Sequence, residues 1–137
     1  MSGRYPIILC IDNSLGGSGQ QRLLQRHGYK VITVTSEREG YSVLRKKPVD
    51  AIILDLEAPG MGPGAAVRRM KDIKPHVPVL LVCHSASIPL GKFSAADAVV
   101  PKNDVPARLP EVLDHLLNVR FPFFDRWFGN LKHRDSA

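Results

Sequence analysis

The segment "VDAIILDLEAPGMGPG", residues 49–64, joins an apolar run to a loop rich in glycine and proline. The apolar part, residues 49–56, is nearly continuous and carries Asp55 at its end. A run of this kind is typical of a strand that is covered on both faces, as parallel strands in α/β proteins are. The segment therefore predicts a buried parallel strand with an acid at its carboxyl end.

Similar apolar runs alternate with amphipathic stretches along the whole chain. A capping box, Ser36 followed by Glu39, marks the start of one helix, and Gly28 is placed to end another. Strand–helix alternation predicts a doubly wound α/β fold, in which a five-stranded parallel sheet lies between two layers of helices. The expected strands are residues 5–11, 29–36, 49–56, 77–85 and 97–102, and the expected helices are residues 18–28, 36–48, 65–75, 88–96 and 109–119.

Composition limits the kinds of function that need to be considered. The chain has 137 residues and a formal net charge of +6, but its cationic residues are scattered at spacings typical of helix surfaces. A nucleic-acid interface needs such residues clustered on one face, so we expect a solvated surface and no nucleic-acid partner. No apolar run approaches the length of a membrane span. The two cysteines suggest no disulfide framework, which favours the cytoplasm.

Polar residues gather at the predicted carboxyl ends of the strands. Asp12 and Asn13 follow the first strand, Asp55 ends the third, Cys83 lies at the end of the fourth, and Lys102 follows the fifth. In open parallel sheets, ligands bind beyond this edge. Mg²⁺ prefers carboxylate and carbonyl oxygens, and an ammonium group would balance two neighbouring acids. The sequence therefore predicts a site for a divalent cation such as Mg²⁺ at this edge.

The glycine-rich stretch "GGSGQQR", residues 16–22, does not support a nucleotide site. Arg22 stands where a dinucleotide-binding motif needs its third glycine, and no Lys–Ser or Lys–Thr pair follows the last glycine as a P-loop requires.

Four patches resemble the receiver domain of two-component response regulators. They are "IILCIDNS", "VDAIILDLEAPGMGPG", "PVLLVCHSA" and "AADAVVPKND", and the similarity extends over about residues 5–120. The resemblance implies a flavodoxin-like fold of strand order 2-1-3-4-5. It also implies that a histidine kinase or a phosphotransfer protein donates a phosphoryl group to an aspartate beside Mg²⁺, and that the chain is a switch rather than an enzyme.

The resemblance assigns roles to particular residues. Asp55 matches the phosphoacceptor, Asp12 and Asn13 match the acidic pair that binds the metal, and the backbone carbonyl of Glu57 matches a further metal ligand. Lys102 matches the lysine that holds the phosphoryl group, and Cys83 stands where a threonine or serine usually does.

Two of these positions depart from the family pattern. Asn13 removes one negative charge and should weaken Mg²⁺ binding. Cys83 offers a weak hydrogen-bond donor in place of a hydroxyl. Val99 or Val100 also stands where an aromatic residue of the fifth strand is expected.

Two readings of the function follow. In the first, a stand-alone receiver, residues 1–120, is phosphorylated on Asp55 and changes its affinity for an unknown downstream protein. In the second, a degenerate receiver acts as an interaction or dimerisation module without phosphorylation. The aromatic and basic extension, residues 121–137, could pack on the core, contact a partner or a second copy, or lie on a membrane; we expect no membrane partner.

Overall fold

A five-stranded parallel sheet forms the centre of the molecule. The computed structural model describes residues 5–12, 19–55, 63–83 and 95–120. The strand order is β2-β1-β3-β4-β5, and every neighbouring pair is parallel, so the predicted fold class and order are confirmed. The strands are β1 (Ile7–Ile11), β2 (Lys30–Val34), β3 (Ala51–Asp55), β4 (Val79–Cys83) and β5 (Ala98–Pro101).

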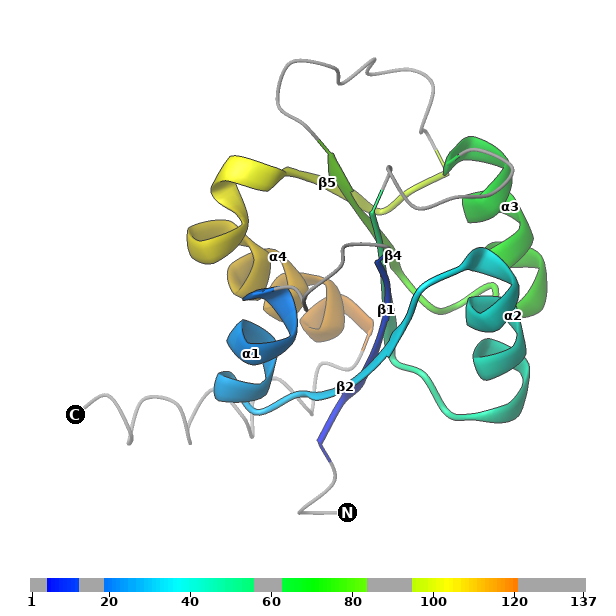
Figure 1. Ribbon diagram of the computed structural model, residues 1–137, viewed down its shortest axis with the longest axis horizontal. Helices are drawn as coiled ribbons and strands as arrows, with labels where there is room; N and C mark the ends of the chain where they lie inside the picture. The colour runs from blue at the N-terminus through cyan, green and yellow to red at the C-terminus, as the bar shows by residue number, and fades with distance from the viewer. Residues whose placement is uncertain (1–4, 13–18, 56–62, 84–94, 121–137) are drawn as a thin grey trace.

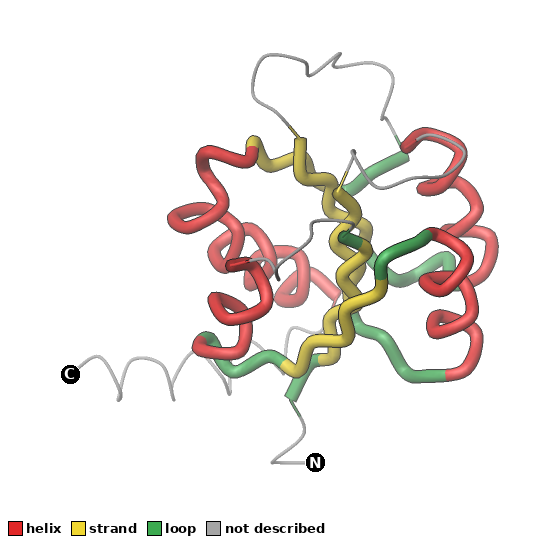
Figure 2. The backbone as a smooth tube through the Cα atoms, viewed as in Figure 1, coloured by secondary structure: helices red, strands yellow, loops and turns green. Residues whose placement is uncertain are grey.

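Helices cover both faces of the sheet. Figure 1 shows α1 and α4 on one side and α2 and α3 on the other, and Figure 2 shows the strands as a single layer between them. No helix in these described ranges is both long and apolar enough to cross a membrane. The helices are α1 (Gly19–Arg26), α2 (Glu37–Lys46), α3 (Pro63–Ile73) and α4 (Val105–Arg120), with the short 3-10 helix η2 (Lys102–Asp104) before α4.

Local sequence signals explain where two helices begin and end. The Ser36 hydroxyl accepts a hydrogen bond from the backbone N–H of Glu39 at 3.3 Å, which confirms Ser36 as the N-cap of α2. The Glu39 carboxylate accepts from the Ser36 hydroxyl, also at 3.3 Å. After α1, Gly28 adopts a positive φ of 88°, and the N–H of Tyr29 donates to the carbonyl of Leu24 at 3.1 Å. This closing geometry needs a left-handed residue, which glycine adopts without a steric penalty.

The last helix differs from its predicted extent. It begins at Val105, four residues before the expected start, and Pro110 lies inside it. Val105 and Leu109 are both buried against the sheet. Burial of these side chains offsets the hydrogen bond that Pro110 cannot donate. Most of the helix expected at residues 88–96 lies outside the described residues.

Side chains alternate between two hydrophobic clusters, one on each face of the sheet. Along β1, Leu9 and Ile11 face α2 and α3, whereas Ile8 and Cys10 face α1 and α4. The same alternation continues along β3 and β4. A residue's position in its strand therefore decides on which face a functional side chain lies.

Candidate functional site

The two predicted carboxylates lie next to each other at the carboxyl edge of the sheet. Ile11 of β1 pairs with Leu54 of β3, so Asp12, one step further along, is level with Asp55. Both residues are buried, each with 4% of its surface exposed. By alternation both continue the face that carries Cys10, which is the face covered by α1 and α4.

Lys102 brings a third charged side chain to the two carboxylates, from the end of the edge strand β5. It follows β5, and its Nζ lies 3.4 Å from Oδ2 of Asp55. The lysine side chain keeps 32% of its surface exposed, whereas that of Asp55 keeps 5%. The lysine thus brings a positive charge from the solvent boundary to a buried carboxylate.

The same three side chains share one pocket of about 490 Å³. Asp12, Asp55 and Lys102 all line it, so the convergence predicted from the sequence is present. Its walls come from the helices on this face. They are formed by Gly19, Gln20, Arg22, Leu23 and Arg26 of α1 and by Val105 and Pro106 of α4.

The donor set suits Mg²⁺, which is usually held by one or two carboxylates together with water and phosphate oxygens. Asp12 and Asp55 would provide the carboxylates, and the metal would bring the positive charge that two adjacent acids require. Among the described residues no group of three or more histidine, cysteine or acidic side chains forms a metal cluster. Asn13 and Glu57, the other predicted ligands, lie outside the described residues.

Cys83 does not line the pocket. It is the last residue of β4 and is buried, with 2% of its surface exposed. By alternation its side chain belongs with Leu81, on the sheet face that α2 and α3 cover. Burial raises the pKa of the Cys83 thiol, and the negative charge of Asp55 raises it further. The group therefore stays a neutral thiol at physiological pH, close enough to Asp55 to sense its charge.

Sequence reasoning missed the arginines of the pocket wall. Arg22 and Arg26 have the spacing of helix-surface residues, which by itself predicts a solvated position. Their spacing of four residues was a signal, because it places both on one face of the helix that comes next after β1 in the chain. The direction of that helix face depends on the rotation at which α1 packs on the sheet, where Leu24 is its buried side chain. The sequence alone does not give this rotation.

Comparisons with known proteins agree with this arrangement. The family profile of the response regulator receiver domain matches residues 7–109. The chain belongs to the family of response regulator receiver domains, which act in two-component systems.

The curated relatives that the chain matches include transcriptional regulators. The chain is 36% identical over 76 residues to the transcriptional regulatory protein QseB of Escherichia coli O157:H7, a match that covers 56% of this chain and 35% of that protein. It is 30% identical over 136 residues to GlrR of Escherichia coli K12, which covers 93% of this chain and 30% of that protein. The chain thus spans about a third of the length of the curated relatives it matches.

Solved structures confirm the fold. A CheY-like receiver domain from Methanospirillum hungatei superposes with a TM-score of 0.77 at 21% identity, covering 85% of this chain and 97% of that one. The response regulator TrrA from Thermotoga maritima, solved in complex with Mg²⁺ and BeF, gives a TM-score of 0.72 at 23% identity, covering 81% and 98% of the two chains.

Proposed function

We propose that the protein accepts a phosphoryl group on Asp55 from a histidine kinase or a phosphotransfer protein, with Mg²⁺ bound beside it. The observation that carries the proposal is the contact of 3.4 Å between Lys102 and Asp55, in a pocket that Asp12 also lines. Mg²⁺ would be held by Asp12 and Asp55, with Asn13 and the carbonyl of Glu57 as further ligands. When bound, it would neutralise negative charge on the phosphoryl oxygens.

The chemistry follows from the positions of these residues. A carboxylate oxygen of Asp55 would attack the phosphorus, and the bond from phosphorus to the donor's imidazole nitrogen would break, with the electron pair leaving on that nitrogen. The ammonium group of Lys102 is placed to meet the charge of the transferred oxygens. Positioning and charge stabilisation of this kind supply most of the catalysis in phosphoryl transfer.

The expected consequence of phosphorylation is altered binding to another protein. The full-length relatives named above are transcriptional regulators, so a partner in gene regulation is one candidate. Dimerisation with a second copy is another. A cytoplasmic location, where an intracellular donor would act, is part of this proposal.

Intact-mass measurement after incubation with acetyl phosphate and Mg²⁺ tests the proposal. The wild type should gain the mass of one phosphoryl group, and Asp55→Asn should gain none. Asp72→Asn is a matched control, because Asp72 is an exposed acid on α3 outside the pocket and its loss should leave the adduct unchanged. If the wild type gains no mass and does not differ from Asp55→Asn, the proposal fails.

A second function is supported by Cys83 and β5. The Cys83 thiol is a weak hydrogen-bond donor. The described strand β5 carries Val99 and Val100 but no aromatic side chain. These features fit a receiver that serves as an interaction or dimerisation module without phosphorylation. In that case the wild type and Asp55→Asn should bind the partner, or a second copy, with equal affinity.

A further inference from the structure

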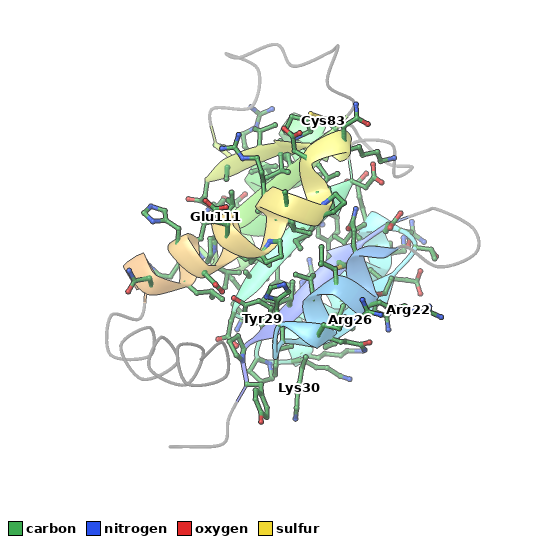
Figure 3. The ribbon with its side chains drawn as sticks, turned by 90° about the vertical axis from the view of Figure 1, so that its left-hand side faces the viewer. Arg22, Arg26, Tyr29, Lys30, Cys83 and Glu111 are labelled. Atoms are coloured by element: carbon green, nitrogen blue, oxygen red, sulfur yellow. The ribbon has the colours of Figure 1, made fainter. Side chains whose placement is uncertain are left out.

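Two arginines of α1 line the pocket that holds the proposed phosphoacceptor. Arg22 and Arg26 are one helical turn apart, and both line the pocket together with Val105 and Pro106 at the start of α4. Figure 3 shows both arginines on α1, with Lys30, the first residue of β2, below them. Both are exposed, and neither guanidinium forms an ion pair with another residue in the part of the chain that the structure describes. They are long, flexible cations beside an anion site.

The pocket has no hydroxyl donor for a phosphoryl group in the described part of its lining. Cys83, at the end of β4, is buried and belongs by alternation to the opposite face of the sheet. The remaining polar side chains of the wall are Gln20, which is buried, and the cations Arg22, Arg26 and Lys102.

The charge balance of the pocket changes when Asp55 is phosphorylated. Before the reaction, the pocket lining carries two carboxylates, Asp12 and Asp55, and three cations, Arg22, Arg26 and Lys102. An acyl phosphate carries about two negative charges where the carboxylate carried one, and it adds acceptor oxygens that reach further into the pocket. Guanidinium groups bind phosphate oxygens in pairs of parallel hydrogen bonds, so the two arginines match the new anion better than they match a buried carboxylate.

We propose that Arg22 and Arg26 close over the phosphoryl group on Asp55, so that α1 is the surface whose charge changes on phosphorylation. The inference rests on the proposed function. Strand β5 offers no alternative group that could respond to the phosphoryl group. Val100 is buried, and Val99 packs with the hydrophobic cluster on the opposite face of the sheet. An acidic partner surface that binds α1 would lose two of its cationic contacts when the arginines turn inward.

Binding of beryllium fluoride, a stable substitute for the phosphoryl group, tests this inference. The protein is titrated with beryllium fluoride in the presence of Mg²⁺ and followed by ¹⁹F and amide NMR. Arg22→Gln/Arg26→Gln should weaken binding about tenfold, the loss expected for charge-assisted hydrogen bonds. Arg38→Gln/Arg45→Gln removes the same charge from exposed positions on α2, outside the pocket, and should change the affinity less than about twofold.

The amide shifts give a second readout that does not depend on the variants. In the wild type, the amides of α1 should shift at least as much as those of β4 and β5. Equal affinities for wild type and Arg22→Gln/Arg26→Gln, or shifts confined to β4 and β5, would overturn the inference while leaving phosphorylation of Asp55 intact. If the wild type binds no beryllium fluoride, both the inference and the proposed function are wrong.

Discussion

Replacing Lys102 with methionine should destabilise the protein because it removes the ammonium group that lies 3.4 Å from the buried carboxylate of Asp55. Opposite charges 3.4 Å apart attract by about 5 kcal/mol at an effective dielectric constant of about 20. Since the lysine side chain is 32% exposed, solvent screens much of this energy. We therefore expect Lys102→Met to lower the free energy of unfolding by about 1–2 kcal/mol.

A double-mutant cycle isolates this pair from other effects of the substitution. In the Asp55→Asn background the carboxylate is already absent, so Lys102→Met should cost close to nothing. Urea unfolding at neutral pH, without divalent cations, gives the four free energies that the cycle requires. A coupling energy below about 0.3 kcal/mol, or an equal cost of Lys102→Met in both backgrounds, would refute the proximity of the two groups.

Three other predictions test the metal site, the packing and the thiols. Asn13→Asp should tighten Mg²⁺ binding about tenfold by adding a carboxylate, as measured by calorimetry; unchanged affinity would exclude residue 13 as a ligand. Gly40→Ala should destabilise the protein by about 1–2 kcal/mol in urea unfolding, because a Cβ there would lie 2.5 Å from Cδ1 of Ile11. Ile11→Val removes that methyl group and should recover most of the loss. If Gly40→Ala were more stable than the wild type, the contact between α2 and β1 would have to be looser than the structure shows. Burial, with the charge of Asp12, raises the pKa of Cys10 from 9.0 to about 12. The neutral thiol therefore contributes its full stabilisation below pH 9, and this contribution is lost as the pH rises toward 12. Cys10→Ala should flatten that part of the curve of unfolding free energy against pH, and an unchanged slope would contradict the raised pKa of Cys10.

The fold was predictable because each strand gives a local signal. The apolar runs that end at Asp12, Asp55 and Cys83 are covered on both faces, so their sequence shows them without knowledge of their neighbours. Strand ends also fix which edge of a parallel sheet the acids share. The convergence of Asp12, Asp55 and Lys102 could therefore be inferred from the sequence alone.

Features that depend on the packing of helices were not predictable in the same way. The start of α4 at Val105 reflects burial against the sheet, which outweighs the signal of Pro110. The placement of Arg22 and Arg26 in the lining of the Asp55 pocket depends on the rotation of α1 about its own axis. The face of the sheet to which the Cys83 side chain points can be deduced from alternation along β4, but only after the register of that strand is known.

Paramagnetic broadening by Mn²⁺, a substitute for Mg²⁺, tests most directly whether these residues form one divalent-cation site. In amide NMR spectra, the signals of Asp12 and Asp55 should broaden together at substoichiometric Mn²⁺, with those around Lys102 following, while signals from the far end of the strands stay sharp. Asp12→Asn should abolish the effect at the same metal concentration. Broadening that is scattered over the surface, or that survives in Asp12→Asn, would contradict the account.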